Sequence, residues 1–134
     1  MEALFVDASE QLTTIMMELV TEHERLLELG QQKKDVLVRN DIRGLQRLVE
    51  EETELVRRVE RLELRRQRAV EKMVGKGAHA SLQDVLEVTP PPVRERLVEQ
   101  AERLRSLLEQ LRQVNEQNRM LVEQGLEFVH ASME

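Results

Sequence analysis

The stretch LQRLVEEETELVRRVERLELRRQRAVEKM, residues 45–73, places apolar side chains at alternating steps of three and four residues. Seven of the nine positions in this series are apolar: Leu45, Leu48, Leu55, Val59, Leu62, Ala69 and Met73. A helix brings residues with this spacing onto one face, so the stretch predicts a long amphipathic helix. Ile42, Val49 and Val56 widen the apolar arc, which predicts that this helix is the middle one and contacts both neighbours.

The sequence on either side predicts two further long helices. Residues 8–36 show the same spacing, again with seven of nine positions apolar, and the third segment carries leucines at similar steps. The expected helices span about 4–38, 41–74 and 92–132. Asn40-Asp41 predicts a tight turn with a helix N-cap, so the first two helices are expected to be antiparallel neighbours.

A connector over residues 75–91 separates the second and third helices. Gly75, Gly77 and the prolines at 90–92 bound it, because glycine ends a helix and proline disfavours helix in the residue before it. Ser81 and Asp84 have the spacing that caps one short helical turn. The predicted fold class is all-α, with residues 1–134 forming a single domain. Its architecture is an elongated antiparallel bundle or coiled coil of three long helices, on the order of 50 Å in length.

Composition restricts the class of protein. Of 134 residues only two are aromatic and none is cysteine, which disfavours a globular α/β enzyme and excludes a thiolate nucleophile. The net charge of −6 argues against binding to nucleic acid or to an anionic membrane. No apolar run approaches the roughly 18 residues that span a bilayer, and the first ten residues lack a basic region, so we expect a cytoplasmic protein without stable membrane insertion.

Possible catalytic and metal-binding patterns in the sequence have simpler interpretations. Glu127 and His130 have the i, i+3 spacing of di-iron bundles, but the other histidines lack such a glutamate. Gly75-Lys76-Gly77 lacks the spacing of a phosphate-binding loop. The arginines between 57 and 68 alternate with glutamates at helical spacing, which indicates a solvated, ion-paired face. Glu52 lies in the apolar series and is expected to pair with a lysine or arginine. We therefore expect no enzyme activity, metal or cofactor.

The third helix carries two apolar rows that lie side by side and share a central column of residues. The rows differ in the residues on either side of that column. The column reads Leu104, Leu111, Asn118, Gly125, so it changes from large to polar to absent side chains. We call the C-terminal part of this face the trough, and we predict that it is a binding site for a partner helix. Its candidate partner-binding residues are Asn115, Asn118, Leu121, Val122, Gly125, Phe128 and Val129. In an alternative interpretation, the asparagines fix helix register and partner number, and Gly125 only weakens the helix near its end.

An ordered set of residues resembles the FlgN-type flagellar export chaperones over nearly the whole chain. It comprises Leu26-Leu27, Lys33-Lys34, Leu37, Asn40-Asp41, Leu45, Leu48, Glu51-Glu52, Leu55, Leu62-Glu63, Arg65-Arg66, Leu111, Asn115, Asn118 and Leu121-Val122. The resemblance implies a cytoplasmic, non-enzymatic chaperone of the hook–filament junction proteins. It also implies delivery to the flagellar type III export gate and ATPase complex, and a C-terminal helix that holds the substrate through Asn115, Asn118 and the aliphatic residues after them.

The predicted function is therefore that of an export chaperone. It would bind terminal amphipathic helical segments of hook–filament junction proteins and prevent their premature assembly. The alternative is a homo-oligomeric structural coiled-coil module with no export role, in which the trough is the interface of a homodimer. Both interpretations use the same apolar residues. A third, an iron-binding four-helix protein, requires a bound metal.

Overall fold

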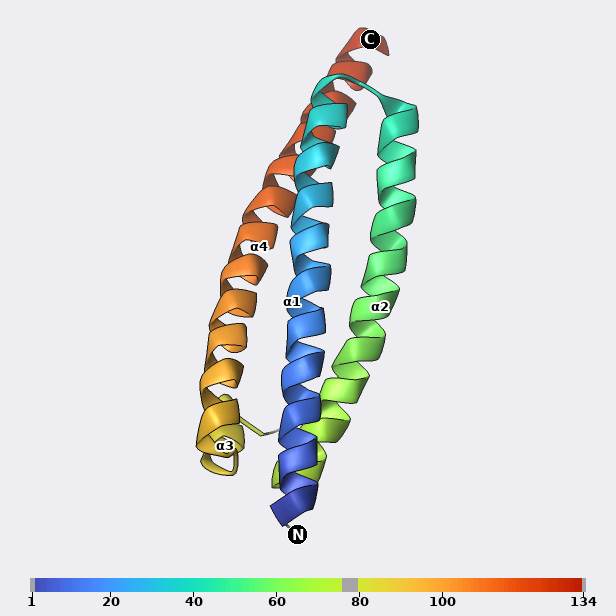
Figure 1. Cartoon of the computed structure of the whole chain (residues 1–134). Coiled ribbons are helices and arrows are strands. Elements are labelled where there is room, and N and C mark those ends of the chain that lie inside the picture. Colours follow the sequence, from blue (N-terminus) through green and yellow to red (C-terminus); the bar gives the residue numbers. More distant parts are fainter. Residues whose placement is uncertain (1, 76–79, 134) are drawn as a thin grey trace.

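The computed structural model describes residues 2–75 and 80–133, and the side chains of 8–75 and 80–125. Three long helices are present, α1 (Glu2–Val38), α2 (Ile42–Val74) and α4 (Pro91–Met133), with a short helix α3 (Leu82–Glu87) before the last (Figure 1). The all-α prediction is confirmed. Each long helix begins and ends within two residues of its expected bounds.

The central helix of the bundle is α1, which packs against α2 on one side and α4 on the other (Figure 1). The chain runs up along α1, down along α2 and up again along α4, so α2 is antiparallel to both other long helices. The prediction that the helix expected over residues 41–74 is the middle one is therefore wrong. Spacing alone gives the width of an apolar arc, and it does not tell which element covers that arc.

The predicted helix ends are confirmed by their hydrogen bonds. Asp41 caps α2, and its Oδ1 accepts a hydrogen bond from the Gly44 N–H at 2.9 Å. Asn40 before it has a φ of 56°, a left-handed conformation that asparagine tolerates in tight turns. Gly75 ends α2 with a φ of 78°, and Ser81 and Asp84 form the reciprocal capping box of α3.

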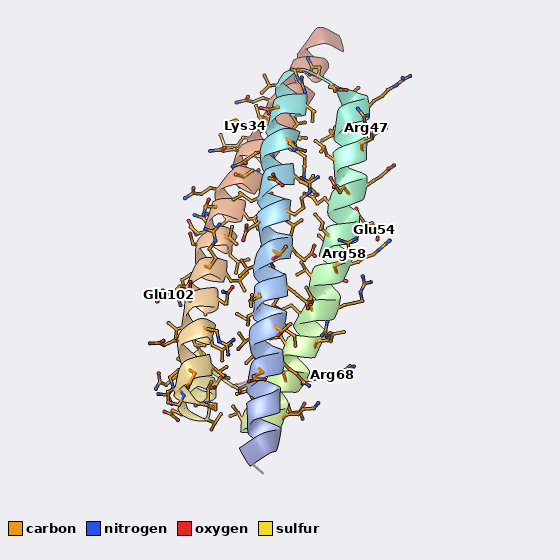
Figure 2. All side chains as sticks on the ribbon, in the orientation of Figure 1. Lys34, Arg47, Glu54, Arg58, Arg68 and Glu102 are labelled. Carbon is orange, nitrogen blue, oxygen red and sulfur yellow. The ribbon has the colours of Figure 1, made fainter. Side chains whose placement is uncertain are left out.

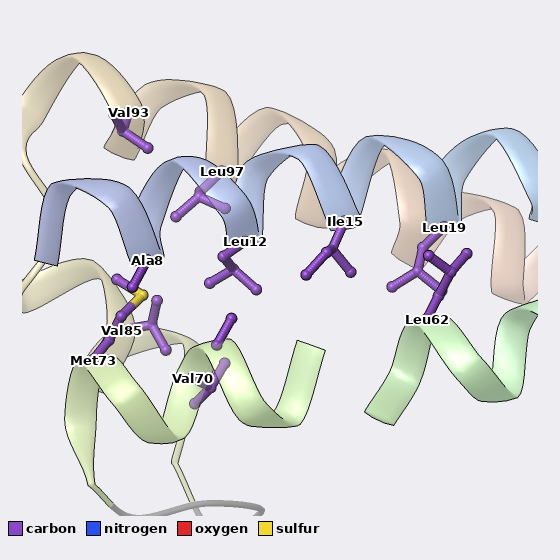
Figure 3. Packing of buried hydrophobic residues seen from close by; sticks show 11 residues of the cluster. Ala8, Leu12, Ile15, Leu19, Leu62, Val70, Met73, Val85, Val93 and Leu97 are labelled. Atoms are coloured by element: carbon purple, nitrogen blue, oxygen red, sulfur yellow. The ribbon is translucent and has the colours of Figure 1, made fainter. Parts of the chain in front are cut away.

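A buried hydrophobic cluster lies toward the end of the bundle where α3 is found (Figure 3). There α3 contributes Val85, which lies beside Met73 of α2 (Figure 3). The other buried members come from all three long helices: Ala8, Leu12, Ile15, Leu19, Leu62, Ala69, Val70, Met73, Val93 and Leu97. Aliphatic side chains form this core, as the near absence of aromatic residues requires.

Ion pairs connect α1 and α2 along the hairpin. The best buried of them joins Lys33 Nζ to Glu52 at 3.1 Å, which confirms the expected partner type for Glu52. The other three are more exposed: Arg25–Glu51, Arg58–Glu22 and Arg65–Glu18. The outer surface is charged, and Figure 2 shows Arg68 and Glu102 projecting from opposite edges of the bundle, on α2 and α4.

Candidate helix-binding groove

An open groove runs over α1 between α2 and α4. It consists of two hollows of about 770 and 620 Å³ that share Leu108 and Arg112, and we call it the α2–α4 groove. Leu12, Met16, His23, Leu26, Lys33 and Leu37 of α1 form its floor. Residues 80–82 and Val85 line the part of the groove next to α3.

The two apolar rows of α4 have different surroundings. Leu107 and Leu111 are buried, with Val114 and Leu121 half-buried in the same row. The second row contains Leu108, Asn115 and Val122, which are exposed and line the groove. Leu108 remains 49% exposed and Val122 45%. One row therefore packs in the bundle, and the other is presented to the groove.

The wide apolar arc of α2 is also explained by residues that face the groove. Val49 and Val56 line the groove from the side opposite α4 and remain 41% and 42% exposed. They belong to a seven-residue repeat that starts at Ile42, which is more exposed still. Thus the arc that suggested a middle helix faces an unfilled position between α2 and α4.

Asn118 holds α4 against α1. Its side chain is buried, and Nδ2 donates a hydrogen bond to the Gly30 carbonyl oxygen at 2.9 Å. Its Oδ1 is buried and has no hydrogen-bond partner among the described residues. A Cβ atom built on Gly30 would lie 2.8 Å from Cγ1 of Val114, so the glycine permits a close approach of the two helices. This geometry fits the alternative in which the asparagine fixes register, and its part in partner binding stays a prediction.

The structure brings three of the predicted partner-binding residues to the groove: Asn115, Asn118 and Val122. Leu121 is half-buried and does not line it. Gly125 is exposed, and a Cβ atom there would have open space around it. The side chains of Phe128 and Val129 lie outside the described residues. The C-terminal end of α4, which carries them, extends past the turn between α1 and α2 (Figure 1).

The groove is lined along α4 by three arginines spaced seven residues apart: Arg105, Arg112 and Arg119. Hydrogen bonds from Arg119 and Arg112 hold the pKa of the Glu116 and Glu109 carboxyls below the usual range. This row was not predicted from the sequence, although its seven-residue spacing was a usable signal. The close approach at Gly30 was not predicted either; its signal was a glycine inside a long helical pattern.

Among the residues that the structure describes, no cluster of three or more histidine or acidic side chains is arranged to hold a metal ion. The side chains of Glu127 and His130 are not part of that set. None of the described helices has an apolar stretch long enough to cross a bilayer. What the groove offers chemically is an apolar surface with charged edges, suited to a partner helix.

Comparison with known proteins identifies the family of the chain. The model of the FlgN protein family matches residues 1–134. No curated relative and no solved structure matches the chain. Since the match covers the whole sequence, the chain belongs to the FlgN family, the non-enzymatic flagellar export chaperones of hook-associated proteins.

Proposed function

We propose that this chain binds terminal amphipathic helical segments of hook–filament junction proteins in the α2–α4 groove. In doing so it prevents their premature assembly and delivers them to the flagellar type III export apparatus. One observation carries the proposal. The second apolar rows of α2 and α4 face each other across α1, and Val49, Val56, Leu108 and Val122 remain exposed there.

The physical basis is the masking of an apolar stripe. A terminal segment that stays unfolded until assembly exposes apolar side chains that would self-associate, and a helix laid in the groove would bury them against three helices. Because the segment must be ordered on binding, part of the interaction free energy is spent on that ordering. Moderate, reversible affinity suits a complex that has to release its substrate at an export gate.

The proposed binding site extends the predicted trough. Asn115, Asn118 and Val122 contribute from α4, and Val49 and Val56 now join them from α2. The trough residues Leu121, Gly125, Phe128 and Val129 are proposed to continue the contact toward the C-terminal end of α4. The open space at Gly125 supports this proposal, because a partner backbone can come close to it.

Two further proposals follow from the family. The chaperone acts in the cytoplasm, where its substrates are made, and it contacts the export gate or ATPase complex while carrying them. The competing occupant of the groove is a second copy of this chain, which would make the groove the interface of a homodimer.

Calorimetric titration with purified hook–filament junction proteins tests the groove. Val122→Asp would place an unpaired carboxylate against the partner's apolar stripe, at a cost of several kcal/mol. We expect its affinity to fall about a hundredfold or more. Met120→Asp is the matched control, because Met120 lies two residues away with a similar exposure of 49% but does not line the groove.

Equal affinities of Val122→Asp, Met120→Asp and the unaltered chain would overturn the groove as the binding site. Circular dichroism checks that both variants keep their helix content. If sedimentation shows a stable dimer that Val122→Asp dissociates, and no junction protein binds, the homo-oligomeric alternative holds instead.

A further inference from the structure

The edge of the groove formed by α4 is basic. Arg105, Arg112 and Arg119 stand about 10 Å apart along the helix, since seven residues rise by that distance, and all three are exposed. They run parallel to the exposed apolar row that begins at Leu108. A partner helix seated on that apolar row would therefore bring its flank alongside three regularly spaced guanidinium groups.

The ion pairs of these arginines stay within α4 and leave the guanidinium groups exposed to a ligand. Arg112 pairs with Glu109, and Arg119 with Glu116 and Glu123, all exposed glutamates of their own helix. Pairs of this kind on a helix surface are weak. Arg105 makes no ion pair with any residue that the structure describes.

On the opposite edge, the charged side chains of α2 that line the groove form ion pairs. Glu52 and Glu63 of α2 line the groove, but each is already paired, with Lys33 and with Arg66. In all, five lysine or arginine side chains and three glutamates line the groove, although the whole chain has a net charge of −6. The groove lining thus has more basic than acidic side chains, and three of its five basic residues lie on α4.

We infer that the arginine row of α4 selects a partner helix by charge. The partner carries acidic residues at seven-residue spacing along one flank of its apolar stripe, and this flank lies against α4. The inference rests on the proposed function and names the chemistry of the segment that the groove takes. The groove follows α4 from Leu97 to Val122, a rise of about 37 Å, which corresponds to a partner helix of about 25 residues.

Two synthetic 25-residue helical peptides provide the test. They share one apolar stripe, and one carries glutamate at three positions spaced by seven along one flank, where the other carries lysine. We expect the acidic peptide to bind about tenfold more tightly at low salt, since each surface ion pair contributes a few-fold. The preference should shrink as salt is raised, because the paired charges are exposed.

Charge reversal of the row is the decisive variant. The triple substitution Arg105→Glu, Arg112→Glu and Arg119→Glu should invert the peptide preference, so that the lysine peptide binds more tightly. Replacement of the same three arginines by glutamine, which avoids new repulsion with neighbouring glutamates, should abolish it. The matched control reverses three exposed arginines that do not line the groove, Arg68, Arg96 and Arg103, and it should keep the original preference at an identical net charge.

The outcomes separate this inference from the proposed function. Equal binding of both peptides, or an equal effect of the control reversal, overturns charge selection. If Val122→Asp still abolishes binding in that case, the groove itself stands as the binding site. If neither peptide binds and the chain sediments as a dimer, the groove is an interface between copies and both proposals fail.

Discussion

Gly30→Ala is the most direct test of how α1 and α4 pack. The new Cβ would lie 2.8 Å from Cγ1 of Val114, whereas carbon atoms in favourable contact are about 3.5–4.0 Å apart. Val114 is β-branched, and its χ1 torsion is restricted in a helix. Its side chain therefore does not make room by changing rotamer, and α4 must move away from α1. That retreat would also stretch the hydrogen bond between Asn118 and the Gly30 carbonyl.

The expected magnitude follows from two opposing contributions. Overpacking in a well-packed site costs about 1–3 kcal/mol, and replacing a mid-helix glycine by alanine returns up to about 1 kcal/mol. We expect Gly30→Ala to lower the free energy of unfolding by about 1 kcal/mol. Gly125→Ala, the same substitution in open space, should raise it by up to about 1 kcal/mol. The two variants should therefore differ by about 2 kcal/mol.

Urea denaturation followed by circular dichroism measures both variants. A double-mutant cycle with Val114→Ala isolates the contact, because removing Cγ1 should relieve most of the overpacking and give a coupling free energy of at least about 1 kcal/mol. If Gly30→Ala stabilised the chain as much as Gly125→Ala, or if the coupling were zero, the close approach of α1 and α4 would be refuted.

Two other substitutions test the polar contacts of the fold. Asn118→Asp removes a donor and places a buried carboxylate against the Gly30 carbonyl, so it should lower the free energy of unfolding by about 3 kcal/mol at neutral pH. The loss should shrink as the pH falls toward about 4, because burial against a carbonyl oxygen raises the pKa of the new carboxyl in the folded chain and the protonated form can donate; a pH-independent loss would contradict the assignment. Asp41→Ala removes the cap of α2 and should cost about 1 kcal/mol in the same denaturation assay, and no change would show that the capping bond is dispensable.

The elements of the fold were predictable because their signals are local. The steps of three and four around Leu55 and Leu62 define a helix whatever lies beside it. The Asn40-Asp41 turn and the Ser81 capping box depend on residues within four positions of each other. Likewise, the position of Glu52 in an apolar series predicted a basic partner, and Lys33 is that partner.

The arrangement of the helices depends on contacts between residues far apart in the sequence, which no local sequence pattern reveals. The extra apolar residues of α2, such as Val49 and Val56, fit equally well against a neighbouring helix or along an open groove. The doubled rows of α4 did indicate surplus apolar surface, and Asn115 and Val122 do face the groove. The participation of α2 in that surface was not predictable, because it follows from α1 lying in the centre.

The central position of α1 also bears on how the chain folds. Its contacts with α2 close through a turn of a few residues, whereas its hydrogen bond with Asn118 joins positions 88 residues apart. Closing the longer loop costs more chain entropy, so we expect the hairpin of α1 and α2 to form early and α4 to dock last. Until that docking step the groove does not exist. The capacity to bind a partner would therefore appear only with the final folding event, and an incompletely folded chaperone would not engage a substrate.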